Sequence, residues 1–372
     1  MISDGTVVID NLLIQALDIP FKLSFSHASA DRSRTQSVLV TATSREGLTG
    51  YGESCPREYV TGESVDSVIA FFHKHQQAAG RISDINSLHD WVMAHRKLID
   101  VDPAAWCAME LAILDLFGKY SQQSVEALLC KPQLSGEFQY SAILGTDDPR
   151  VFEKLLVMYL DMGFTDFKIK LMGEWKRDLE KIELLKMNID ESMRIRFDAN
   201  NCWADADTAY RYLTELDCPF WAVEEPLIKG DYQALGKLAA SLECKIILDE
   251  SFLRLEQLTE LEESAESWLI NIRVSKMGGL LRSLELVDAI SSRGIPVIVG
   301  AQVGETSLLT RAAMTVAIYA GDMLMAQEGA YGTYLLEHDI CEPVLKFGRG
   351  GRLDIGAESL QDRFGLGLSV IS

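Results

Sequence analysis

The chain has 372 residues, of which 48% are hydrophobic and 24% charged, a globular composition long enough for a large core and, we expect, two domains. Its 35 Lys and Arg against 55 Asp and Glu give a formal net charge of −20, which argues against a nucleic-acid partner. No apolar run approaches bilayer length and no signal-peptide pattern opens the chain, so we expect a cytoplasmic protein without a membrane partner.

The first third predicts an α+β domain. Residues 7–60 alternate β-rich runs with turns, which is typical of an antiparallel meander, and residues 65–117 show helical apolar spacing. Pro103 lies at the expected first turn of the last of these helices, and Gly118 is a candidate stop. We place this capping domain at residues 1–130, followed by a catalytic domain at 131–330 and a terminal segment at 331–372.

From residue 138 the pattern changes to strands that alternate with helices. Eight strand candidates recur at roughly 25 to 30 residues per unit, which favours a (β/α) barrel; they cover residues 141–144, 167–170, 195–198, 221–224, 246–249, 269–273, 297–300 and 324–328. A doubly wound open sheet is the second choice, because it usually has fewer strands and a Gly-rich first turn, which this sequence lacks.

The second of these strands carries two lysines at alternate positions. Side chains two residues apart on a strand point to the same face, so Lys168 and Lys170 lie side by side. On an inward face, desolvation and mutual repulsion push at least one of them toward its neutral form, and a neutral lysine can take a proton from carbon. The alternative is an exposed edge strand with two solvated lysines.

Acidic residues close the next three strands in succession. These are Asp198, Glu224 and Asp249, and in a barrel the ends of consecutive strands meet at one mouth. A single acid after a strand is usually a cap or turn residue, but three converging carboxylates repel one another without a cation. Hard oxygen ligands suit Mg²⁺, with Mn²⁺ as a second choice, so the spacing predicts a metal site beside the lysines.

These motifs together resemble the enolase superfamily, and within it the muconate lactonizing enzyme subgroup, which includes muconate cycloisomerases, o-succinylbenzoate synthases and dipeptide epimerases. The resemblance rests on Lys168-x-Lys170, Asp198-Ala-Asn, Glu224-Glu-Pro, Asp249-Glu-Ser and the Lys276-Met-Gly-Gly turn, in this order. The segments at 50–56 and 59–63 also resemble the subgroup's capping-domain loop.

The resemblance implies an α/β fold, a (β/α)₇β TIM-like barrel with an amino-terminal α+β cap to which the last residues return. It also implies that Asp198, Glu224 and Asp249 bind Mg²⁺, that Lys170 is the acid/base and that Lys168 depresses its pKa. All six histidines lie outside residues 138–328, so no barrel strand presents a His–Asp dyad. A lysine base remains, and a cation on the substrate carboxylate would stabilise the enediolate.

The sequence departs from the subgroup at two positions. Where a second catalytic lysine usually ends the sixth strand, the chain has Arg273, with Lys276 three residues later. Arginine stays protonated, so Arg273 either holds a substrate carboxylate or forms a structural ion pair. The paired aspartates of dipeptide epimerases are also missing after the eighth strand, where Glu328 is the only acid, and this puts a peptide-like substrate in doubt.

We therefore expect an Mg²⁺-dependent isomerase of the cycloisomerase or epimerase type that acts on a small carboxylate, as a homo-oligomer. A lyase, either a syn dehydratase or an o-succinylbenzoate-synthase-like enzyme, is the alternative, and a barrel that only binds a small acid is a third. Beyond the catalytic groups, the candidate substrate-binding residues are Asn200, Glu250, Gln302, Glu305, Glu328, Tyr59 and His27.

Overall fold

The computed structural model describes residues 6–27, 30–356, 360 and 363–371, and its amino-terminal part has the predicted strands followed by helices. An antiparallel sheet in the order β1-β4-β5 consists of β1 (Ile9–Leu17), β4 (Ser37–Ser44) and β5 (Thr49–Ser54), while β2 (Pro20–His27) pairs with β3 (Ala30–Arg34). The helices that follow are α1 (Val65–Ala79), α2 (Ile85–Ala94), α3 (Arg96–Val101), α4 (Pro103–Ser121) and α5 (Val125–Leu128).

Helix α4 is the centre of this part. It is buried without interruption from Pro103 to Gly118, so it has no solvent-exposed face over this stretch. Strand β5 approaches it through two glycines. A Cβ atom on Gly50 or Gly52 would lie 2.2 Å from a backbone carbonyl oxygen of α4, so only glycine permits this distance between the sheet and the helix.

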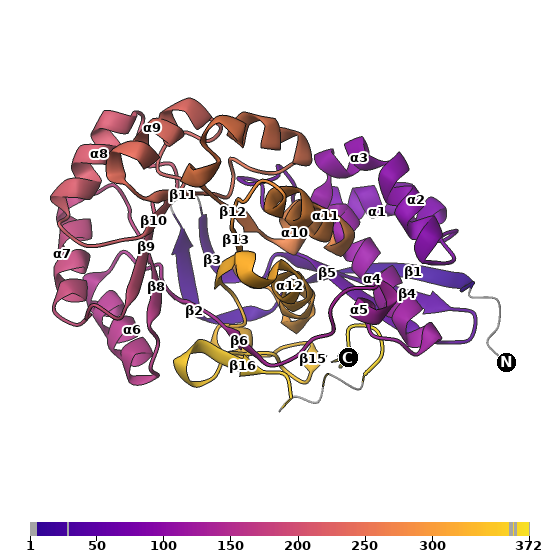
Figure 1. The fold of residues 1–372 in the computed structure, drawn as a ribbon. Coiled ribbons are helices and arrows are strands. Elements are labelled where there is room, and N and C mark those ends of the chain that lie inside the picture. Colours follow the sequence, from indigo (N-terminus) through magenta and orange to yellow (C-terminus); the bar gives the residue numbers. More distant parts are fainter. Residues whose placement is uncertain (1–5, 28–29, 357–359, 361–362, 372) are drawn as a thin grey trace.

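Eight parallel strands then form one curled sheet in the chain order β7 to β14 (Figure 1). The Ser141 amide donates to the Gln327 carbonyl (2.8 Å), which joins the last strand to the residue preceding the first. The barrel prediction is confirmed and the open sheet is wrong. The strands are β7 (Ala142–Leu144), β8 (Asp166–Lys170), β9 (Arg194–Asp198), β10 (Ala222–Glu224), β11 (Lys245–Leu248), β12 (Trp268–Ile272), β13 (Val297–Val299) and β14 (Leu324–Gln327).

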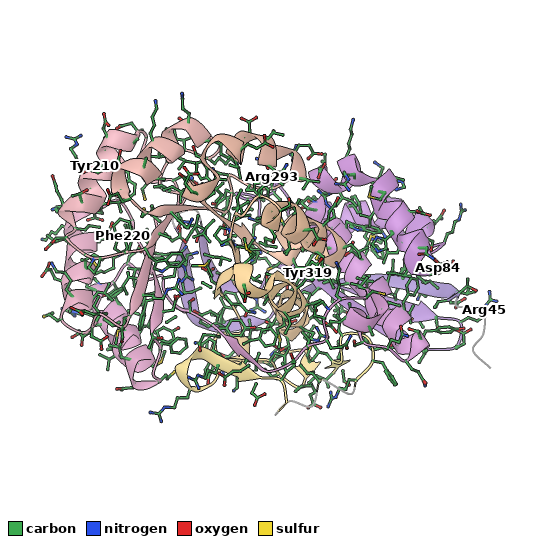
Figure 2. All side chains as sticks on the ribbon, viewed as in Figure 1. Arg45, Asp84, Tyr210, Phe220, Arg293 and Tyr319 are labelled. Atoms are coloured by element: carbon green, nitrogen blue, oxygen red, sulfur yellow. The ribbon has the colours of Figure 1, made fainter. Side chains whose placement is uncertain are left out.

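Helices cover the outside of the curled sheet, as Figure 1 shows for α6 to α9. Phe197, an outward residue of β9, packs against Phe220 in the loop that precedes β10, with ring centroids 4.9 Å apart. Phe220 is labelled in Figure 2. The helical segments are α6 (Pro149–Asp161), α7 (Trp175–Lys186), α8 (Ala206–Glu215), α9 (Tyr232–Leu242), the 3₁₀ segment η1 (Leu255–Ser267), α10 (Val274–Met277), α11 (Leu280–Ser291) and α12 (Ser307–Ala320).

The inside of the barrel has an apolar region and a charged region. Ala222, Ile247, Leu269 and Ile298 form a small buried cluster on β10 to β13. Two residues further along β10 and β11, the inward positions are Glu224 and Asp249. The apolar cluster thus supports a polar site at the carboxyl ends of the strands, where active sites of such barrels lie.

The end of the chain returns to α4. The Leu366 amide donates to Asp115 Oδ1 (2.8 Å) and the Gly365 amide donates to the Gln123 carbonyl (2.8 Å). Short antiparallel pairs lie along this path, β6 (Glu137–Gln139) with β16 (Arg352–Asp354) and β15 (Cys341–Glu342) with β17 (Ser369–Val370). The domain boundaries themselves stay a prediction. Among the described helices, none is long and apolar enough to cross a membrane.

Candidate active site

Both lysines of β8 point into the barrel. Strand β8 lies between β7 and β9, and Lys168 and Lys170 are only 3% and 7% exposed. The alternative prediction, an exposed edge strand with two solvated lysines, is therefore wrong. Lys170 Nζ donates to Asn200 Oδ1 (3.1 Å). Burial lowers the pKa of Lys170 below the ordinary lysine value, and the neighbouring charge of Lys168 acts in the same direction, although Asp198 opposes both.

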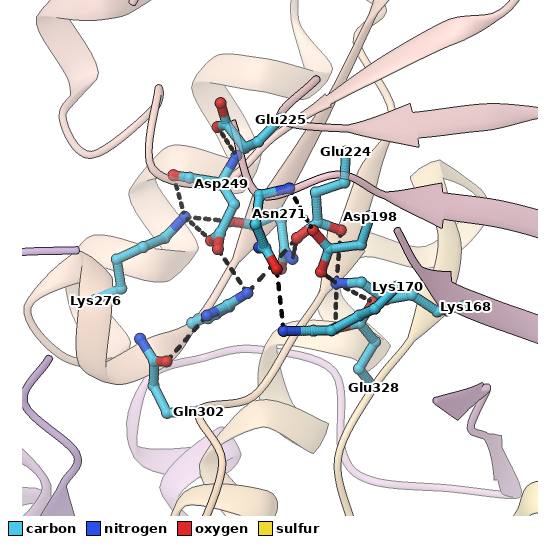
Figure 3. Close-up of polar contacts among 12 residues, drawn as sticks. Lys168, Lys170, Asp198, Glu224, Glu225, Asp249, Asn271, Lys276, Gln302 and Glu328 are labelled. Atoms are coloured by element: carbon cyan, nitrogen blue, oxygen red, sulfur yellow. Dashed lines mark hydrogen bonds and ion pairs between the residues drawn. The ribbon is translucent and has the colours of Figure 1, made fainter. Parts of the chain in front are cut away.

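The three acidic candidates lie together at the ends of their strands (Figure 3). Asp198 and Glu224 are the last residues of β9 and β10 and are paired in the parallel register, while Asp249 follows β11 directly. All three are buried. Glu225 fixes the position of Asp249, because its Oε1 accepts the Asp249 amide at 2.6 Å. Carboxylates on successive strand ends are the hard oxygen donors that a divalent cation prefers.

Two cations lie between these carboxylates. Lys168 Nζ is 3.1 Å from Asp198 Oδ2 and 2.7 Å from Glu224 Oε2. Arg273 extends an amino group to Asp249 Oδ2 (2.6 Å) and to Glu224 Oε1 (3.6 Å). Among the described residues, no three His, Cys, Asp or Glu side chains are arranged to hold a metal ion. The three carboxylates are the kind of oxygen donor that Mg²⁺ prefers. In this arrangement, Lys168 and Arg273 neutralise their negative charge.

Arg273 and Lys276 have different surroundings, which the sequence could not distinguish. Lys276 is 1% exposed, and its Nζ donates to Asp249 Oδ1 (2.8 Å), the Asp249 carbonyl (2.8 Å) and the Asn271 carbonyl (2.7 Å). It is turned back behind Asp249, not placed beyond the mouth of the barrel. Arg273 lines the pocket, where one of its amino groups donates to Gln302 Oε1 (2.9 Å).

The pocket collects most of the predicted substrate-binding residues. Tyr59 from the cap loop and residues from seven barrel strand ends line it, among them Asn200, Glu250, Gln302 and Glu328. Glu305 is not part of the lining. Its Oε1 accepts the backbone amide of Gln302 (2.6 Å) and thereby fixes the pocket loop. The His27 side chain lies outside the described part of the chain. Ile143, Ala301 and Val303 also line the pocket and were not predicted.

Glu328 is held by two internal cations. Lys168 Nζ lies 3.3 Å from its Oε1, and Arg196, fully buried inside the barrel, donates to the same oxygen at 2.9 Å. Burial opposes ionisation, but Lys168 and Arg196 outweigh it and hold the pKa of Glu328 below its ordinary value. Sequence reasoning missed Arg196, although strand alternation places it on the same face as Asp198.

A second missed group lies behind the catalytic strand. Lys181 of α7 is fully buried and donates to the Lys170 carbonyl (2.8 Å) and to Asp178 Oδ1 (2.9 Å). Asp178 accepts the backbone amides of Met172 and Gly173 at 2.9 Å. The pair therefore fixes the backbone where β8 ends. No local sequence pattern predicts it, because an i,i+3 pair on a helix is usually solvated.

Known proteins share this fold and part of this sequence. Residues 152–371 match the family model described as "Enolase C-terminal domain-like". A hydrophobic dipeptide epimerase of Enterococcus faecalis is 27% identical over 79% of this chain and 82% of its own, and an N-succinyl-L-Arg/Lys racemase of Bacillus cereus is 27% identical over 82% of each. The E. faecalis epimerase with Mg and L-Leu-L-Tyr superposes with a TM-score of 0.84 at 25% identity, covering 97% of this chain and 99% of that one.

Proposed function

Because the chain belongs to the enolase C-terminal domain-like family and is an isomerase-type enzyme, we propose that it removes the proton α to a substrate carboxylate and returns a proton to the resulting enediolate. The epimerase and racemase relatives support this class of reaction. Lys170 is the base. This assignment rests on one observation: the Lys170 amine is buried in the pocket beside the carboxylate cluster, where its pKa is lowered.

Asp198, Glu224 and Asp249 would hold a divalent cation, and Mg²⁺ is the expected ion. When bound, such a cation supplies positive charge that stabilises the enediolate oxygens. The Mg-containing structure of the E. faecalis dipeptide epimerase supports the choice of ion. Lys168 keeps the cluster ordered through its contacts with Asp198 and Glu224 and adds a fixed positive charge beside Lys170.

Proton transfer is confined to the Lys170 side of the substrate. Arg273 faces the pocket and stays protonated, so it is a poor acceptor, while Lys276 has its three donors committed to Asp249 and Asn271. Arg273 therefore acts as a fixed cation for a substrate anion. Its Nε is buried and has no hydrogen-bond partner among the described residues, which leaves one donor for such a contact.

The same arrangement favours one alternative, a lyase. A syn elimination needs only one well-placed base, which can also return the proton to the leaving group on the same face. A cycloisomerase is compatible with a single base as well, whereas a symmetric two-base epimerase is not. The replacement of the second lysine by Arg273 is thus the observation that keeps a lyase as the second candidate.

The pocket suits a substrate with a second anionic or acceptor group better than one with a free ammonium group. Glu328, the acid that follows the eighth strand, already pairs with Lys168 and Arg196. Arg273 offers a buried donor nearby. N-acyl amino acids and dicarboxylates are therefore expected to be better substrates than dipeptides, which the E. faecalis relative binds.

A hydrogen-exchange screen in D₂O tests the proposal. Both enantiomers of N-acyl amino acids, dipeptides and sugar acids, together with muconates, are incubated with enzyme and Mg²⁺ and followed by NMR. We expect α-proton exchange from one enantiomer of an N-acyl or dicarboxylate substrate, abolished in Lys170→Ala. Exchange that persists in Lys170→Ala would disprove the role of Lys170. Equal exchange from both enantiomers, lost in Lys276→Ala, would establish a two-base epimerase instead.

A further inference from the structure

We infer that the Arg273 guanidinium competes with the divalent cation for the carboxylate oxygens of Asp249 and Glu224, and so sets the metal affinity of the enzyme. The inference rests on the proposed metal site. It concerns a residue that replaces the subgroup's second lysine, and it assigns to that residue a role in metal binding as well as in contacting the substrate.

The contacts of Asp249 carry the inference. Its Oδ2 is 2.6 Å from an Arg273 amino group, and its Oδ1 is 2.8 Å from Lys276 Nζ. Each oxygen of this buried carboxylate is therefore already paired with a cation. A metal ion that takes Asp249 as a ligand must displace one of them or share an oxygen with it, and two adjacent buried cations repel strongly.

Arg273 is the cation that can leave. Lys276 has all three of its N–H donors committed to two backbone carbonyls and to Asp249 Oδ1. The other end of Arg273 reaches Gln302 Oε1 at 2.9 Å, on the pocket side and away from Asp249. The backbone amide of Gln302 donates to Glu305 Oε1, which fixes the backbone of this loop residue. The guanidinium thus has a second acceptor, and it keeps a hydrogen bond when Asp249 is given up.

The charge balance shows why this competition matters. Asp198, Glu224 and Asp249 carry three negative charges, and Lys168, Arg273 and Lys276 contact them with three positive charges. The cluster is thus neutral before a metal ion binds. Removing the charge of Arg273 leaves a net negative site and one unpaired oxygen of Asp249, both of which favour a divalent cation.

Calorimetric titration of the chelator-treated full-length enzyme with MgCl₂ tests the inference without any substrate. Arg273→Gln is expected to bind Mg²⁺ at least tenfold more tightly than the wild type, because no guanidinium has to be displaced. Gln302→Leu keeps the Arg273 charge but removes its second acceptor, so it is expected to bind Mg²⁺ at least threefold more weakly. The double variant should behave like Arg273→Gln, since Gln302 acts only through the guanidinium.

The opposite signs separate competition from a structural role, which would weaken Mg²⁺ binding in both single variants. Unchanged or weaker binding in Arg273→Gln overturns the inference, as does unchanged or tighter binding in Gln302→Leu. If Arg273→Gln does not fold, as judged by circular dichroism, the Gln302→Leu titration decides alone. Absence of binding in every folded protein would refute the metal site of the proposed function itself, whereas equal affinities would refute only the competition.

Discussion

Replacing Lys181 by methionine is expected to destabilise the protein and to slow catalysis without weakening substrate binding. The Nζ of Lys181 pairs with Asp178 and donates to the Lys170 carbonyl, and both charged residues are fully buried. Breaking a buried pair typically costs about 3–5 kcal/mol of unfolding free energy. Asp178 retains donors from Met172, Gly173 and Tyr212, so we expect the lower end, about 3 kcal/mol.

The corresponding shift in melting temperature can be estimated from chain length. An unfolding entropy of about 2.1 cal/mol/K per residue gives roughly 0.8 kcal/mol/K for this chain, so 3 kcal/mol lowers Tm by about 4 °C. Differential scanning calorimetry measures this directly. Lys186→Met, on the same helix but at a partly exposed position, is the matched control and should change Tm by less than about 1 °C.

Kinetics provide the functional half of this prediction. Lys181 touches the backbone of Lys170 and does not line the pocket, so kcat should fall while KM stays near the wild-type value. Asp178→Asn combined with Lys181→Met leaves no unpaired charge and should recover part of the lost stability. A single variant that melts like the wild type, or one that raises KM with kcat unchanged, would refute the reasoning.

Three further predictions concern the metal, the base and the cap. Asp249→Asn should lose Mg²⁺ binding by calorimetry and most activity, and it should also lower stability, because Arg273 and Lys276 lose a buried partner. Chelation followed by Mg²⁺ return should abolish and restore wild-type turnover, and normal metal content in the variant, shown by circular dichroism to be folded, would exclude this site. The rate of α-proton exchange should rise with pH, with an inflection below the pKa of ~10.4 of an ordinary lysine. Lys168→Ala removes a charge that lowers the pKa of Lys170, so it should move the inflection to higher pH. An unmoved inflection would contradict this role of Lys168. Burial raises the pKa of Glu53 from 4.5 to about 8, so the folded state binds more protons than the unfolded state between these values, and stability should fall as pH rises from about 4.5 to 8. Chemical denaturation should show a flatter pH dependence in Glu53→Gln, and an identical slope would contradict the assignment.

The positions of the inward lysines and of the three acids could be predicted because they depend on two local rules. Side chains alternate along a strand, and the carboxyl ends of parallel barrel strands meet at one face. These rules place Lys168 and Lys170 together and bring Asp198, Glu224 and Asp249 to the same mouth. The same alternation also predicts that Arg196 points into the barrel, on the face of Asp198.

Other features depend on contacts between distant segments and could not be predicted. The direction of Lys276 follows from α10, a short helix that begins immediately after β12 and turns the side chain back toward the Asp249 and Asn271 carbonyls. Glu305 and Gln302 are three residues apart in one loop, yet only Gln302 reaches the pocket. The roles of both depend on loop geometry, which residue type alone does not determine.

Helix α4 has a consequence for how the chain can be divided. Its Glu110 accepts the Leu281 amide of α11 at 2.9 Å, its Asp115 accepts the Leu366 amide, and its apolar residues belong to the same continuous core as the barrel helices. A fragment that began at residue 131 would contain every strand-end acid and both lysines of β8, yet it would expose the apolar surfaces of α10 and α11 that α4 covers. Such a fragment should aggregate through these exposed apolar surfaces. The chain therefore needs residues of the cap in order to fold, although its strand-end acids and both lysines of β8 lie in the barrel.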